Sequence, residues 1–236
     1  MQDHYHVVER LPNSLYSTHF FPDPSGVELR VSNNISRYID LQTELRINNA
    51  SDVLTYFRQL SDLNEMSTSE RFIASRSELN TLENWPNEIK YGGVNNQFKQ
   101  VVYRRYYDGW PIFSEGDLNT LTEVGVLEEG LSQLRLPLLI IQTPLSIDEN
   151  AEVNLASGEE VIADLTSVVD LDLVQDLTLG YTWDDSREEE QVVRLTPEWF
   201  VKSQDKWTSL DDFMDQGGLS LIQSLSGLAR QTASNL

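Results

Sequence analysis

The chain's three histidines all lie near its N-terminus, at positions 4, 6 and 19. His4 and His6 are two residues apart, so an extended strand would place both imidazoles on one side, where they could bind a metal. No third ligand follows at a recognisable spacing, which favours an exposed chain end instead. The sequence therefore predicts no metal site, and no motif predicts a cofactor.

Ser203 and Lys206 match the Ser-x-x-Lys pattern of penicillin-recognising acyltransferases. Ser32-Asn33-Asn34 faintly echoes the second motif of that class, but the order is reversed and no Lys-Thr-Gly follows. The chain also lacks cysteine, a Gly-x-Ser-x-Gly elbow, a phosphate loop and a dinucleotide fingerprint. We therefore interpret the match as chance and predict a protein that is not an enzyme and has no catalytic residues.

Carboxylates are the remaining reactive groups, since 38 Asp and Glu residues stand against 17 Lys and Arg. The run from Asp184 to Glu190 could bind a hard cation such as calcium, but it lacks EF-hand spacing and is better interpreted as a solvated loop. Pairs of Asp or Glu leave a carboxylate-dependent hydrolase of cell-wall material open as an alternative.

The net charge of −21 repels phosphate backbones and anionic lipid surfaces. A nucleic-acid partner is therefore not expected. No segment approaches the roughly 20 consecutive apolar residues that a membrane-spanning helix needs. We expect any membrane attachment to come only from an anchor outside these residues.

The densest group of aromatic residues surrounds Asp108-Gly109, the strongest short-range signal for a β-hairpin. An antiparallel hairpin divides these side chains between two faces, one of which should belong to the core. Exposed aromatic residues beside arginines would be typical of protein interfaces, whereas the alternative is that both faces are covered within the protein. The candidate interaction residues are Arg104, Tyr106, Tyr107, Trp110 and Phe113.

The elements that must position these residues are short. Alternating apolar residues between 27 and 58, with turns at Asn33-Asn34 and Asn48-Asn49, predict a β-meander. Ser67 and Ser157 each precede a glutamate by three residues, so capping boxes predict helices that begin there. Further strands are expected within 98–113, 118–127 and 134–145, and a second hairpin over 177–201.

This order of elements, with no regular alternation of strand and helix, predicts an α+β fold with antiparallel sheets and a few packed helices. A weak similarity between the two halves would fit two related units. We place a boundary near residue 63. Residues 1–62 would form the meander and the back part of a middle domain, residues 63–210 a C-terminal α+β domain, and residues 211–236 a helical or frayed tail.

The order of several segments resembles the YycH family. The segments include Phe20 to Ser25, Asp108 to Phe113, Leu179 to Tyr181 and Leu195 to Trp199, and the resemblance runs from about residue 11 to about residue 207. It implies a regulatory module of Gram-positive bacteria that binds a YycI-like protein and the WalK (YycG) sensor histidine kinase. That kinase belongs to the WalK/WalR two-component system, which controls cell-wall homeostasis.

The resemblance also implies a location. YycH proteins are held at the extracytoplasmic face of the cell membrane by an N-terminal transmembrane helix, so we expect this chain to be an ectodomain fragment. The family brings no catalytic residues. A passive wall-associated structural domain remains a further alternative.

Overall fold

The computed structural model describes residues 1, 3–60, 66–82, 89–95, 97–117, 119–145, 153–168, 171–187 and 192–215. These residues form fourteen β-strands, three α-helices, two short 3-10 helices and a further helical segment over 210–215, which confirms the α+β class. The elements are β1 (His4–Arg10), α1 (Asn13–Phe20), β2 (Glu28–Ser32), β3 (Ile35–Ile39), β4 (Thr43–Asn48), β5 (Val53–Arg58), α2 (Thr68–Asn80), β6 (Ile89–Asn95), β7 (Gln100–Tyr107), β8 (Trp110–Phe113), η1 (Glu115–Asp117), β9 (Leu121–Leu127), β10 (Gly130–Pro137), β11 (Leu139–Pro144), α3 (Gly158–Val168), η2 (Leu171–Leu173), β12 (Asp176–Arg187), β13 (Val192–Ser203) and β14 (Lys206–Ser209).

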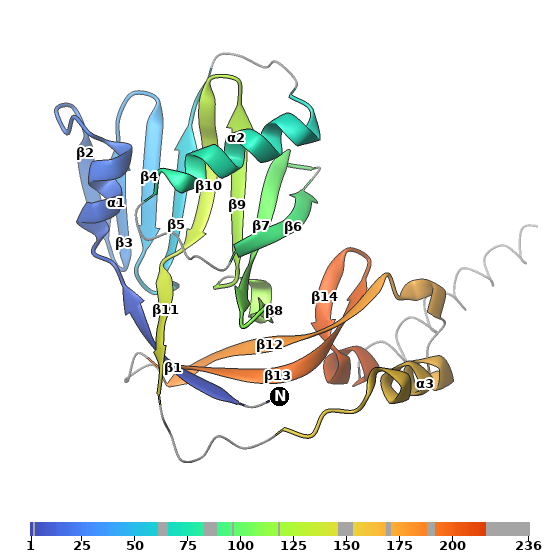
Figure 1. Ribbon diagram of the computed structural model, residues 1–236. Helices are drawn as coiled ribbons and strands as arrows, with labels where there is room; N and C mark the ends of the chain where they lie inside the picture. The colour runs from blue at the N-terminus through green and yellow to red at the C-terminus, as the bar shows by residue number, and fades with distance from the viewer. Residues whose placement is uncertain are drawn as a thin grey trace, which may run out of the picture. The chain divides into compact units, whose positions relative to one another are not determined.

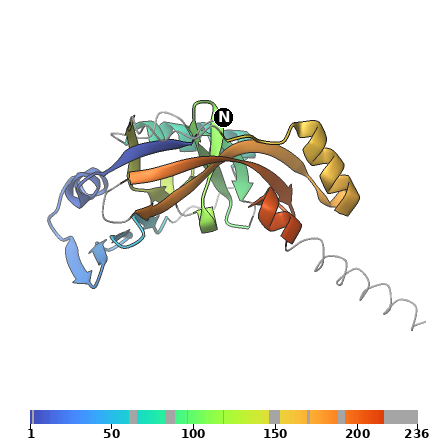
Figure 2. The same cartoon turned by 90° about the horizontal axis from the view of Figure 1, so that it is seen from below.

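The chain divides into two compact units. The larger unit comprises His4–Ile147 and Trp183–Leu195, and the smaller comprises Met1–Asp3, Asp148–Thr182 and Thr196–Leu236. The hairpin of β12 and β13 is divided between the two units. The end of β12 from Trp183 and the start of β13 as far as Leu195 belong to the larger unit, and the rest of both strands belongs to the smaller unit. Figures 1 and 2 both show β12 and β13 as two long strands that lie side by side.

The larger unit is built on an antiparallel sheet (Figure 1). The strands β2 to β5 follow one another as the predicted meander, and β5 then pairs with β10 in the order β7-β9-β10-β5-β4-β3-β2. Leu54 stands opposite Ile47 on one side and Leu136 on the other. The boundary expected near residue 63 falls inside this unit, because strands from both sides of it share the sheet.

Two helices cover one face of this sheet (Figure 1). Tyr16 of α1 and Leu79 of α2 join one hydrophobic core with buried strand residues that include Leu45, Ile47 and Leu54. The predicted capping box begins α2: the Ser67 hydroxyl accepts from the Glu70 backbone N–H, and the Glu70 carboxylate accepts from the Ser67 N–H at 2.8 Å. These bonds satisfy donors that the first helical turn leaves unpaired.

The smaller unit packs α3 against the outer parts of the hairpin. Val161 and Leu165 of α3 form a core with Val201 of β13 and Phe213. The second predicted capping box is present, because the Glu160 carboxylate accepts from the Ser157 backbone N–H at 2.8 Å. The chain is helical from 210 to 215, and the predicted helical residues from Leu219 onwards lie outside the described residues.

Within the described ranges, no helix is both long enough and apolar enough to cross a bilayer.

Candidate protein-binding hairpin

The predicted aromatic hairpin is formed by β7 and β8. Asp108 and Gly109 make its turn with φ values of 47° and 84°. Positive φ at both central positions gives the tight turn that matches the twist of paired strands, and Asp-Gly adopts it at low cost. Tyr107 consequently pairs with Trp110, and Tyr106 pairs with Pro111.

Two of the five candidate residues, Arg104 and Phe113, lie inside the protein. The Arg104 guanidinium carbon sits 4.3 Å from the centroid of the Phe113 ring. Its Nη1 donates to the Ile112 carbonyl and to Asp117 Oδ1, each at 3.0 Å. Arg104 and Phe113 therefore brace the hairpin from within, and a partner cannot reach them in this conformation.

The other three candidates keep accessible surface. Tyr106 and Tyr107 are half-buried, and 39% of Trp110 is exposed at the start of β8. The Lys90 ammonium lies 4.3 Å from the centroid of the Tyr106 ring, a distance typical of a cation–π contact. Trp110 is the most accessible of the five side chains and marks the outer surface of the hairpin.

The expectation that the segment with His4 and His6 is an exposed chain end is wrong, whereas His19 is exposed. β1 pairs with β11 on one side and β13 on the other, so His6 is fully buried. Its Nδ1 lies 3.1 Å from the Gln142 carbonyl, and its ring centroid lies 4.6 Å from that of Tyr107. Burial lowers the pKa of His6 below its ordinary value.

His4 lies on the same side of β1, with its ring centroid 6.1 Å from that of His6. Across the described part of the chain, no group of three or more histidine, aspartate or glutamate side chains is arranged to hold a metal ion.

A buried arginine beside the hairpin escaped the sequence reasoning. Arg105 is only 4% exposed, and burial lowers its pKa to about 10. Its guanidinium carbon lies 5.4 Å from the centroid of the Trp183 ring. The sequence did carry a signal for this burial. Along β7 every second residue points to the same face, so Arg105 shares a face with the buried Val101 and Tyr103.

The Ser-x-x-Lys match proves to be a hairpin turn. Ser203 and Lys206 are paired residues of β13 and β14, and Gln204 and Asp205 form the turn with positive φ. The acyltransferase pattern needs a serine that opens a helix, and Ser203 instead ends a strand. In the acidic run, Asp184 belongs to β12, whereas Glu188 to Glu190 lie outside the described residues.

The smaller unit contains a hollow with two carboxylates, Glu198 and Asp211. Burial raises the pKa of Glu198, and the nearby charges of Asp211 and Asp212 raise it further. A carboxyl group with a raised pKa beside another carboxylate is a feature of glycoside hydrolases. The hollow, however, measures about 170 Å³, below the roughly 300 Å³ at which ligand pockets begin. It therefore lends no support to a hydrolase of wall polymers.

The fold defines the class as a mixed α+β domain with antiparallel strands. A family model described as the YycH protein, C-terminal domain, matches residues 1–218. The chain belongs to this family, which is a family of regulatory proteins.

The chain is also similar in fold to the crystal structure of YycH from Bacillus subtilis. The TM-score is 0.66 at 18% sequence identity, over 89% of this chain and 52% of that chain. This chain thus spans about half the length of the solved one. A search of curated proteins found no match.

Proposed function

We propose that the chain is a non-catalytic regulatory ectodomain that acts with a YycI-like protein on the WalK (YycG) sensor histidine kinase. In this role it would lie at the extracytoplasmic face of the membrane and influence cell-wall homeostasis through the WalK/WalR system. Membership of the YycH family supports a regulatory role. The likeness to the Bacillus subtilis protein supports the fold on which that role depends.

The observation that carries the binding site is the exposure of Trp110 beside the half-buried Tyr107, with which it pairs across the hairpin. Tryptophan and tyrosine supply much of the energy of protein interfaces because they bury large areas at low entropic cost. Arg104 holds the start and the end of the hairpin together through Ile112 and Asp117, so Trp110 is presented on a rigid element. A rigid aromatic anchor loses little freedom on binding.

Co-purification tests this proposal with the full-length, membrane-anchored protein. The tagged protein should retain both the YycI-like protein and the kinase from detergent-solubilised membranes. Trp110→Ala should weaken binding to at least one of them by about thirtyfold or more and reduce its retention accordingly, since interface anchors contribute about 2 kcal/mol or more. Leu41→Ala, at an equally apolar and fully exposed turn residue, is the matched control and should leave retention unchanged.

Two results would reject different parts of the proposal. If the wild-type protein retains neither partner, the regulatory function is wrong. If Trp110→Ala retains both as well as wild type does, the function stands but the hairpin is not the site. A deletion strain with unchanged kinase output would favour a passive wall-associated domain.

A further inference from the structure

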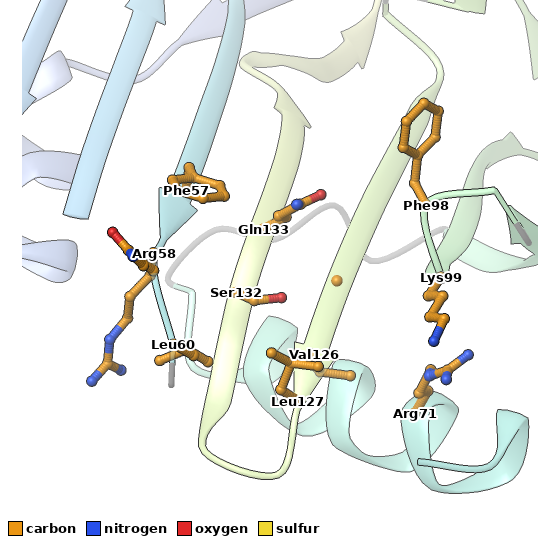
Figure 3. Close-up of a pocket in the computed structure, with 12 residues that line it drawn as sticks. Phe57, Arg58, Leu60, Arg71, Phe98, Lys99, Val126, Leu127, Ser132 and Gln133 are labelled. Carbon is orange, nitrogen blue, oxygen red and sulfur yellow. The ribbon is translucent and has the colours of Figure 1, made fainter. Parts of the chain in front are cut away.

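A hollow of about 490 Å³ opens on the larger unit, and none of the hairpin candidate residues lines it (Figure 3). Segments distant in sequence line it: the end of β5, the first turns of α2, the residues before β7, and the paired strands β9 and β10. Its volume falls within the roughly 300–1,000 Å³ typical of ligand-binding pockets.

Two backbone features create the floor of this hollow. A Cβ atom on Gly125 would lie 3.1 Å from Gln133 Cβ and 3.2 Å from Ser132 Oγ, so any larger residue there would crowd these two side chains. The register of β10 against β9 shifts between Leu131 and Gln133, which leaves Ser132 outside the regular pairing. Gln100 Nε2 donates to Gln133 Oε1 at 2.8 Å and fixes that side chain.

The two walls carry the same combination of groups. Figure 3 shows Phe57, Arg58 and Leu60 on one side of the hollow and Phe98 and Lys99 on the other. Phe57 is 51% exposed and Phe98 is 58% exposed, which is unusual for large apolar side chains. Each wall therefore offers an aromatic ring next to a cation.

The described lining of the hollow is opposite in charge to the chain as a whole. Among the described residues that line it, three are cations, Arg58, Arg71 and Lys99, and none is acidic, although the chain has a net charge of −21. Among the described residues, no carboxylate forms an ion pair with Arg58 or Arg71. Cations around an apolar recess favour an anionic ligand with an apolar group.

We propose that this hollow binds a short acidic segment of a partner protein, in which carboxylates flank one bulky apolar side chain. The apolar side chain would enter between Phe57 and Phe98. The flanking carboxylates would meet Arg58 on one wall and Lys99 and Arg71 on the other. Ser132 offers a hydroxyl to the peptide backbone. A nucleic-acid strand fits less well, since its many phosphates would face the net negative charge of the chain.

Fluorescence anisotropy with the 236-residue chain tests this proposal. The probe is a fluorescein-labelled acetyl-Asp-Glu-Phe-Glu-Asp amide at low ionic strength, where charge complementarity acts most strongly. Saturable binding is expected. Replacing the probe's phenylalanine by alanine, or its acidic residues by their amides, should weaken binding by about tenfold.

Matched variants locate the site. Arg58→Gln combined with Lys99→Asn removes one cation from each wall, and asparagine suits the positive φ of 54° at position 99. This variant should bind the probe about tenfold more weakly. Arg30→Gln removes an exposed cation that pairs with Glu28 outside the hollow, and it should bind the probe as wild type does. Circular dichroism confirms that each variant is folded.

Absence of saturable binding, or equal loss in the Arg30→Gln control, would overturn the proposal. Displacement of the probe by inorganic pyrophosphate at lower concentrations than by unlabelled peptide would also overturn it, in favour of a phosphate ligand. Neither result bears on the retention of the kinase by the anchored protein, so the two proposals fail separately.

Discussion

The hydroxyl of Tyr103 in β7 lies 2.7 Å from the hydroxyl of Ser75 in α2, and both side chains are buried. Ser75 Oγ also donates to the Phe72 carbonyl at 3.0 Å. This contact is a polar link in an otherwise apolar layer between helix and sheet, so it fixes α2 along the strand direction. Hydrogen bonds in buried layers specify one packing arrangement among several apolar ones.

Tyr103→Phe should therefore lower the free energy of unfolding by about 1 kcal/mol, because a buried hydrogen bond is lost without opening a cavity. Urea denaturation followed by circular dichroism measures the change. Tyr91→Phe, at an exposed tyrosine of the neighbouring strand, should change it by less than about 0.5 kcal/mol. Equal losses in the two variants would contradict the role of the link.

Arg104→Met should lower the free energy of unfolding by about 2–3 kcal/mol. The change keeps much of the apolar stem but leaves the Ile112 carbonyl and the partly buried Asp117 without their charged donor. Arg30→Met breaks an ion pair in which both side chains are well exposed, so it should leave the free energy of unfolding nearly unchanged. Urea denaturation measures both changes, because a shift of the midpoint with an unchanged dependence of the free energy on urea concentration reports a change in stability. Equal midpoints for the two variants would contradict the role of Arg104.

His6 should make the protein less stable below neutral pH. Its pKa in the folded protein is lowered by burial, so its contribution is fully present above the unfolded value of about 6.5. It is lost as the pH falls from there towards the lower folded-state pKa. His6→Asn should therefore flatten the decline in melting temperature between about pH 7 and pH 5. His19→Asn, at an exposed position, should keep the wild-type slope.

Glu198 should make the protein less stable as the pH rises, the opposite of the effect of His6. A carboxyl group whose folded-state pKa is raised contributes stability that is fully present below its unfolded value of about 4.3 and is lost as the pH rises. Glu198→Gln should raise the melting temperature at pH 7 by a few degrees, about what 1 kcal/mol produces, and leave it unchanged near pH 4. A raised melting temperature at both pH values would contradict a charge effect.

A second glutamate of the smaller unit, Glu159, provides a control for which the melting temperature should change in the opposite direction. Glu159→Gln removes an exposed charge from the first turn of α3, where a negative charge is favoured by the helix dipole. It should lower the melting temperature slightly at pH 7.

The elements that the sequence predicted well are those with local signals. The meander, the Asp108-Gly109 turn and both capping boxes depend on residues within a few positions of one another, and each is present. The environment of β1 could not be predicted, because its partners lie in β11 and β13, more than a hundred residues away. Periodicity shows which side chains share a face, whereas distant strands decide whether that face is covered.

The same distinction explains the candidate sites. The alternation of side chains along a strand predicts that Arg104 and Arg105 point to opposite faces of β7. The sequence does not reveal that both of these faces are covered at that point. The hollow is harder still to predict. Arg58, Arg71 and Lys99 look like scattered surface charges until the pairing of β5 with β10 brings their segments around Gly125.

The position of β1 has a consequence for the order in which the protein can be completed. His4 stands opposite Leu195, so β1 cannot complete its pairing until a strand much later in the chain has been synthesised. A chain that emerges N-terminus first can pair β1 with β11 while its other edge stays open. Closing so long a loop is slow. Prematurely ended chains that stop before β13 would keep this open edge permanently, which makes them targets for proteases and distinguishes them from finished copies.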